Sequence, residues 1–205
     1  RTREAVFWSV VWITLAVIFG IGVYRWMGRD AGLEFFAGYV IEKALSVDNL
    51  FVFVLIFGWF RVPAALQHRV LFWGILGALF IRGGMIAGGV YLINQFHWIT
   101  YVFGAFLAFT GIRMAMGGDH HIDPSTHIVT RLVRRLLPVT PGYVGQRFFV
   151  KQQMETGRRL AATPLFVVLA LVETTDVVFA VDSIPAVFAV TTDPFIVYSS
   201  NVFAI

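Results

Sequence analysis

Acidic side chains inside apolar segments are the residues of this chain with the clearest capacity for chemistry. Five of its twelve Asp and Glu residues fall inside such segments. They are Glu42, Asp48, Glu173, Asp176 and Asp182. A carboxylate at the centre of a membrane helix costs about 2.5–3.5 kcal/mol to insert, so five would cost on the order of ten kcal/mol unless paired, protonated or bound to a cation. Lys43 and Arg82 could neutralise two of the five, and the three that remain favour a bound cation.

Two of the apolar segments carry the same acidic pattern. Each copy has an acid, an Asp six residues later, and then a small amide or hydroxyl residue. The copies read Glu42-Lys-Ala-Leu-Ser-Val-Asp48-Asn49-Leu and Asp176-Val-Val-Phe-Ala-Val-Asp182-Ser183-Ile. They are offset by 134 residues and lie three predicted crossings apart, so we expect them to traverse the membrane in opposite directions. Such a pair is typical of inverted-topology repeats, which place a substrate site near the bilayer midplane.

The side chains of this pattern offer oxygen ligands only. The apolar segments contain no His and the chain contains no Cys. Oxygen ligands suit hard divalent ions such as Mg²⁺, Ca²⁺ and Mn²⁺ better than Zn²⁺ or Cu²⁺. The predicted metal-binding set is Glu42, Asp48, Asn49, Glu173, Asp176, Asp182 and Ser183. A buried carboxylate can also carry a proton, so exchange of the cation for protons is a further expectation, and no prosthetic group is expected.

The second copy of the pattern contains a helix-breaking signal. Pro185 has no amide hydrogen, so it frees the carbonyl of Val181 from a helical hydrogen bond. We therefore predict a break in the helix around Asp182, and a second break around Asp48. Broken helices are tolerated at membrane depth where they line a cavity, and a freed carbonyl would be one more cation ligand.

The composition indicates the environment in which these residues act. Apolar residues make up 58% of the chain, and only 14% of residues are charged, against about 25% in soluble domains. The mean hydropathy is +0.77. These values exclude disorder, a fibrous protein and a soluble enzyme, and they predict an integral membrane protein in a lipid bilayer. The net charge of +4 is typical of basic cytoplasmic loops, so nucleic acid is not an expected partner.

Hydropathy predicts an all-α, polytopic bundle that forms one transmembrane domain. Its spans are residues 7–24, 33–60, 70–93, 98–116, 164–190 and a partial 194–205. Glycines of the third span are expected to allow close helix packing. The 117–163 loop holds seven basic and three acidic residues, which places it and the N-terminus in the cytoplasm by the positive-inside rule. Because the chain begins at Arg1 and stops in an apolar run, we expect a fragment that is truncated in the second repeat.

Other sequence signals are weaker. The loop contains Asp119, His120, His121, Asp123 and His127, which could bind a transition metal, although a solvated loop is the simpler interpretation. The sequence contains no phosphate-binding loop, nucleotide fingerprint or hydrolase triad, so no enzymatic activity is expected.

Three segments, residues 42–53, 173–186 and 190–205, resemble the signature segments of the TerC/Alx family and are most similar to its bacterial Alx branch. The resemblance implies a bacterial inner-membrane protein linked to manganese export and to tellurite or alkaline-pH phenotypes. The acidic motif positions of the family fall on the seven residues of the predicted set. Asn201 lies in the third matching segment, and we expect it, Lys43 and Arg82 to act in the pathway or as counter-ions.

These observations favour a transporter that exports a divalent cation, with Mn²⁺ expected above the others. One alternative is a membrane scaffold or insertion partner in a metal or tellurite stress-resistance complex, whose function would lie in the 117–163 loop. Another is a membrane-embedded metalloenzyme, which would need a base or nucleophile beside the ion, and the spans offer no His or Cys. The oligomeric state is not predicted.

Overall fold

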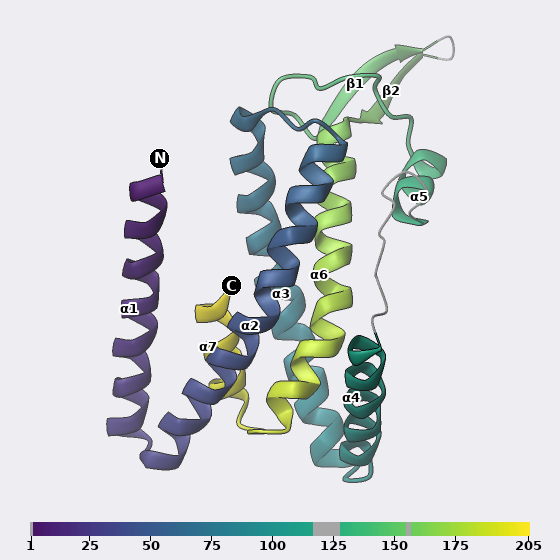
Figure 1. The fold of residues 1–205 in the computed structure, drawn as a ribbon. Helices are drawn as coiled ribbons and strands as arrows, with labels where there is room; N and C mark the ends of the chain where they lie inside the picture. The colour runs from purple at the N-terminus through teal and green to yellow at the C-terminus, as the bar shows by residue number, and fades with distance from the viewer. Residues whose placement is uncertain (1, 117–127, 155–156) are drawn as a thin grey trace. The chain divides into compact units, whose positions relative to one another are not determined.

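The fold is known from a computed structural model that describes residues 2–116, 128–154 and 157–205. The elements of these residues follow one another as shown in Figure 1. They are α1 (Thr2–Trp26), α2 (Arg29–Trp59), α3 (Ala64–Gln95), α4 (Ile99–Ala115), α5 (Ile128–Leu136), β1 (Phe149–Met154), β2 (Gly157–Ala162), α6 (Pro164–Phe188) and α7 (Pro194–Ala204). The predicted all-α class is confirmed, with one short β-hairpin added to it.

Each predicted span falls on one of these helices. Within the described residues, three helices are long and apolar enough to cross a membrane: Arg3–Trp26, Ala64–Gln95 and Pro164–Phe188. Ile99–Arg113 is a shorter apolar helix. Helix α2 has 31 residues, but its middle carries three charged residues, Glu42, Lys43 and Asp48. The hydropathy pattern therefore predicted the positions of the helices. A segment in the membrane must form its backbone hydrogen bonds internally, so long apolar stretches form helices.

The predicted helix breaks are wrong. Helix α2 is continuous through position 48, and α6 is continuous through position 182 to Phe188. Pro185 lies inside α6, and the helix continues beyond it because the amide of Ala189 donates to the carbonyl of Pro185 at 3.1 Å. A proline removes one backbone hydrogen-bond donor from a helix, and an apolar helix can tolerate this loss without ending.

The chain divides into two compact units. The first consists of Arg1–Val47, Arg82–Met116 and Ala180–Ile205, and the second of Asp48–Ile81 and Gly117–Phe179. Helices α2, α3 and α6 each contribute one part to each unit.

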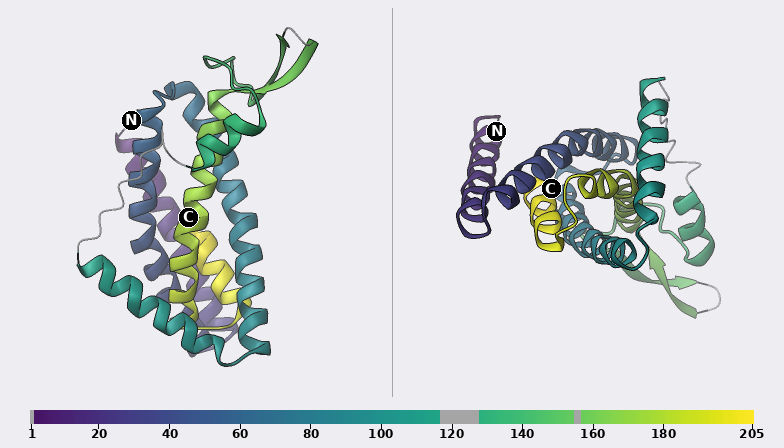
Figure 2. Two further views of the ribbon diagram at one scale, coloured as in Figure 1. Left: turned by 90° about the vertical axis from the view of Figure 1, so that its right-hand side faces the viewer. Right: turned by 90° about the horizontal axis from the view of Figure 1, so that it is seen from below.

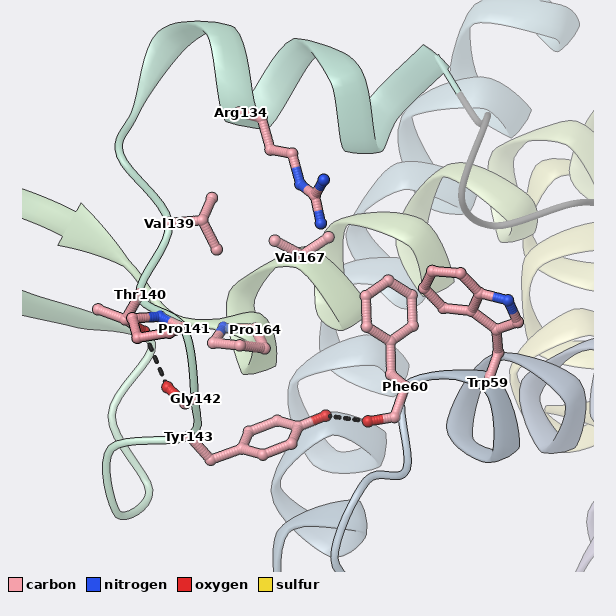
Figure 3. Close-up of a pocket in the computed structure, with 10 residues that line it drawn as sticks. All are labelled: Trp59, Phe60, Arg134, Val139, Thr140, Pro141, Gly142, Tyr143, Pro164 and Val167. Atoms are coloured by element: carbon pink, nitrogen blue, oxygen red, sulfur yellow. Dashed lines mark hydrogen bonds between the residues drawn. The ribbon is translucent and has the colours of Figure 1, made fainter.

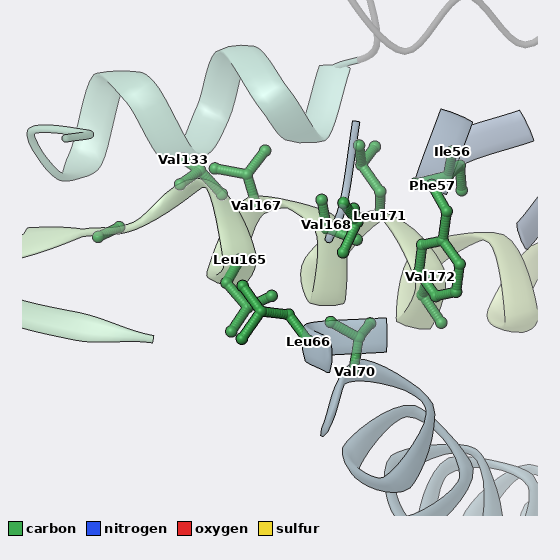
Figure 4. Packing of buried hydrophobic residues seen from close by; sticks show 12 residues of the cluster. Ile56, Phe57, Leu66, Val70, Val133, Leu165, Val167, Val168, Leu171 and Val172 are labelled. Atoms are coloured by element: carbon green, nitrogen blue, oxygen red, sulfur yellow. The ribbon is translucent and has the colours of Figure 1, made fainter. Parts of the chain in front are cut away.

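The second unit has the larger apolar cluster, shown in Figure 4. Its buried members include Ile56, Phe57, Leu66, Val70, Val133, Ala162, Leu165, Val168, Leu171 and Val172. Because α5 contributes Val133 and β2 contributes Ala162, part of the predicted loop is folded against the helices. In the same unit the C-terminal end of α2 lies near the N-terminal end of α6, and the two helices run in opposite directions (Figure 1).

The first unit holds α7 beside the first part of α2, as Figure 2 shows. Tyr39 of α2 and Ala204 of α7 share a buried cluster with Ala16 of α1. The start of α7 is encoded locally: the side chain of Asp193 accepts hydrogen bonds from the amides of Phe195 and Ile196, at 2.8 and 3.3 Å. A proline follows at the first helical position, so the helix begins where both signals predict.

Candidate functional site

A buried polar network joins four helices of the first unit. It consists of Glu42 on α2, Arg82 on α3, Ser183 on α6 and Asn201 on α7, each with at most 2% of its surface exposed. Arg82 Nη1 forms an ion pair with Glu42 Oε1. The same nitrogen donates to Asn201 Oδ1 at 3.1 Å, and Ser183 Oγ donates to Glu42 Oε1 at 3.3 Å.

Two atoms of this network lack hydrogen-bond partners among the described residues. Glu42 Oε2 is a buried acceptor and Asn201 Nδ2 is a buried donor. Buried polar atoms are normally satisfied, so each such atom indicates a bound water, ion or ligand group. A bound group would complete the hydrogen bonding of this network if it placed a cation or a hydrogen-bond donor at Glu42 and a hydrogen-bond acceptor at Asn201.

Lys43 and Asp182 lie in the same unit but differ in environment from Glu42. Lys43 is exposed, and its Nζ donates to the carbonyl of Ala204 at 3.1 Å. Asp182 is half-buried beside Ser183 in the chain. Of the two cations considered as counter-ions, Arg82 is thus the one paired with a carboxylate, whereas Lys43 binds the C-terminal end of α7.

The second unit contains three more residues of the predicted set. Asn49 on α2 and Asp176 on α6 are buried, and Glu173 is half-buried one helical turn before Asp176. Glu173 Oε2 and Asn49 Oδ1 are buried acceptors that receive no hydrogen bond from the described residues. Both are oxygen atoms that a cation or a proton donor would satisfy. Asp48 belongs to this unit by its position, but its side chain lies outside the described part of the structure.

A glycine of α3 makes space for one of these carboxylates. The carboxylate of Glu173 fills the volume that a Cβ atom at Gly77 would need. The sequence indicated only that glycines of this span allow close helix packing, and no signal showed which glycine meets an acid. Gly74 and Gly89 do approach side chains closely, but Gly84 and Gly88 have nothing within 4 Å of the Cβ position.

The predicted metal-binding set is therefore divided between the units. Glu42, Asp182 and Ser183 belong to the first unit, and Asp48, Asn49, Glu173 and Asp176 belong to the second. Among the described residues, no three His, Cys, Asp or Glu side chains are grouped so that they could hold a metal ion. The loop candidates at positions 119, 120, 121, 123 and 127 lie outside the described residues.

Apolar helices that bury charged side chains define a multi-pass integral membrane protein. Residues 27–205 match the integral membrane protein TerC family, which covers most of the chain. The chain belongs to the TerC family, as its signature segments predicted. No solved structure matches it significantly.

Several curated relatives match nearly the whole chain. An uncharacterized membrane protein of Myxococcus xanthus is 53% identical over 205 residues, which cover 100% of this chain and 63% of that protein. The "Putative membrane-bound redox modulator Alx" of Escherichia coli K12 is 47% identical over 211 residues, covering 99% of this chain and 64% of that protein. An uncharacterized membrane protein of Rickettsia bellii is 41% identical, with 99% and 66% covered. The chain thus spans just under two thirds of the length of these relatives.

Proposed function

We propose that the full-length protein exports a divalent cation, Mn²⁺ above others, through the acidic residues of α2 and α6. The observation that carries this proposal is a set of three buried oxygen atoms that accept no hydrogen bond from the described residues. They are Glu42 Oε2, Asn49 Oδ1 and Glu173 Oε2. All three are acceptors, which a transported cation or a proton would satisfy where the described residues do not. We include exchange of the cation for protons in the proposal.

The chemistry of these ligands favours a hard ion. Carboxylate and carboxamide oxygens bind Mn²⁺, Mg²⁺ and Ca²⁺ in preference to softer metals. The Escherichia coli relative is named a putative redox modulator. Manganese is redox-active, so control of its concentration would provide a chemical basis for that name. These 205 residues contain no Cys that could perform thiol chemistry themselves. The proposal assigns transport rather than catalysis and requires no prosthetic group.

The proposal includes a location and an orientation. We place the protein in the bacterial inner membrane, with the N-terminus and residues 117–163 in the cytoplasm. The excess of basic residues in that segment supports the orientation.

The test is the manganese content of a manganese-sensitive bacterium that expresses the full-length protein. We expect the parent to lower cellular manganese, and Asp48→Asn and Asp182→Asn, expressed to equal levels, to abolish the effect. Asp30→Asn is the matched control because Asp30 is an exposed acid in the first turn of α2. This control should behave like the parent.

A different outcome would favour the second candidate, a membrane scaffold or insertion partner. The specific observation in its favour is that part of the predicted loop is folded, with α5 and the hairpin packed on the helices. If both Asp variants lower manganese as the parent does, while deletion of residues 128–162 abolishes function, the scaffold replaces the transporter.

A further inference from the structure

A pocket of about 660 Å³ lies in the second unit, between α5 and the ends of two apolar helices (Figure 3). It is lined by Trp59, Phe60, Arg134, Val139, Thr140 and Pro141, with Gly142, Tyr143, Pro164 and Val167. Arg134 extends from α5 toward Val167 and is the one charged residue among those that line the pocket.

The pocket lies at the ends of the helices, the level at which a membrane surface is expected. Trp59 is the last residue of α2, and Pro164 is the first residue of α6, which is apolar enough to cross a membrane. Tyr143 holds the 138–143 segment at this level, since its hydroxyl donates to the carbonyl of Phe60 at 2.9 Å. Burial raises the pKa of Tyr143 above its ordinary value. Tryptophan at the end of an apolar helix is typical of the headgroup level.

The charge of the surrounding segments is strongly positive. Residues 128–154 and 157–163 contain seven Arg and Lys residues and no Asp or Glu. Among the described residues, Arg134 has no hydrogen-bond or ion-pair partner. Its guanidinium group is thus available to an anion, and arginine binds phosphate oxygens with two parallel hydrogen bonds.

Helix α5 also exposes an apolar stripe. Ile128, Leu132 and Leu136 are 75%, 53% and 71% exposed and recur every four residues, so they share one face. Arg131 and Arg135 lie along one edge of this face, and Val133, beyond its other edge, packs on the core. Arg134 lies on the far side of the helix, where it lines the pocket. A short helix with an apolar stripe beside arginines is typical of helices that lie in the membrane interface.

We propose that this pocket binds the phosphate headgroup of an anionic phospholipid, with Arg134 as its ligand. The stripe of Ile128, Leu132 and Leu136 enters the adjacent acyl region and holds α5 against the membrane. The position at the helix ends, the guanidinium group that has no partner among the described residues, and the exposed stripe all fit a lipid, whereas a soluble anion would use only the charge. This site is independent of the proposed cation transport.

The test is a native mass-spectrometry titration of the purified full-length protein with phosphatidylglycerol and with phosphatidylcholine of identical acyl chains. We expect a preference for phosphatidylglycerol, and Arg134→Gln should weaken its binding about tenfold or more, the loss expected when a charge-assisted hydrogen bond is removed. Arg131→Gln is the matched control, because Arg131 is exposed on the same helix but does not line the pocket. Arg134→Lys should retain part of the preference, which separates loss of charge from loss of fold.

Three results would overturn the proposal. Equal weakening by Arg131→Gln and Arg134→Gln would indicate diffuse surface charge rather than a site. Equal binding of the two lipids would exclude an anionic headgroup and leave an acidic protein surface as the partner of α5. Displacement of phosphatidylglycerol by millimolar inorganic phosphate would assign the pocket to a soluble anion.

Discussion

Individual acidic residues of this protein have different surroundings despite their common type. Glu42 Oε1 is paired with Arg82 and receives a hydrogen bond from Ser183, whereas Glu42 Oε2 has no hydrogen-bond partner among the described residues. The carboxylate of Glu173 instead packs against the backbone of Gly77, and one of its oxygens accepts no hydrogen bond from the described residues. The two carboxylates should therefore respond differently to substitution of their neighbours.

Gly77→Ala tests whether the position of the Glu173 carboxylate matters. The new methyl group would occupy the space of that carboxylate, which can swing away because it is the end of a flexible side chain. We expect stability to change by less than about 1 kcal/mol, because only the end of a flexible side chain has to move. Under the proposed function, manganese export by the full-length protein should fall about tenfold, at the lower end of the losses seen when support of a metal ligand is removed.

The control for this substitution is Gly84→Ala on the same helix, where the Cβ position has nothing within 4 Å. Export measured by cellular manganese and stability measured by thermal unfolding in detergent separate the two effects. Unchanged export in Gly77→Ala would mean that the carboxylate of Glu173 is not part of the pathway.

Helices of the first unit are joined by polar contacts as well as by apolar packing. Glu42, Arg82, Ser183 and Asn201 come from α2, α3, α6 and α7, and all four side chains are buried. Helix α7 has only 11 residues, so its position depends on such contacts and on the Asp193 cap more than on its own helix propensity. Loss of one member of the network should therefore loosen several helices together.

Arg82→Gln should lower the free energy of unfolding by about 3–5 kcal/mol, because it leaves the carboxylate of Glu42 buried without its cation. The double variant Glu42→Gln and Arg82→Gln should recover much of this loss, since it removes both charges together. Thermal unfolding of the parent, both single variants and the double variant gives the coupling energy. A double variant that is less stable than Arg82→Gln alone would show that the ion pair is not the source of the effect.

Charge is distributed unevenly over the whole molecule. Residues 128–163 are rich in Arg and Lys, whereas the short connection between α3 and α4, residues 96–98, has neither. In a multi-pass membrane protein this asymmetry sets the orientation, because basic loops are retained in the cytoplasm.

This orientation can be tested by introducing one cysteine at a time into a full-length protein that has no other cysteines. Asn94 is exposed in the last turn of α3, and Val144 is exposed in the connection between α5 and β1. We expect Asn94→Cys to react in intact cells with a maleimide that cannot cross the membrane, and Val144→Cys to react only after permeabilisation. Both variants should react fully in permeabilised cells, which controls for access. Labelling in the reverse order would place residues 128–163 outside the cytoplasm.

The sequence by itself determined the membrane class, the position of each long helix and the family. Apolar stretches long enough to span a bilayer are local properties of the chain, and so are the Asp193 cap and Pro194 that begin α7. The same local argument failed at Pro185, where it predicted a break and α6 continues, because a proline removes one helical hydrogen bond without preventing the rest.

Only the tertiary structure decided which charges meet. Lys43 follows Glu42 directly in the chain, yet the partner of Glu42 is Arg82, forty residues away, because neighbouring side chains on a helix point about 100° apart. Glu173 lies beside Gly77 and not beside another glycine of α3, and this likewise depends on how α3 packs on α6. Folding of α5 and the hairpin was missed for the same reason, since Val133 and Ala162 are buried by helices distant in the chain. Composition predicts how apolar a segment is, but the partners of a buried charge are set by packing between segments.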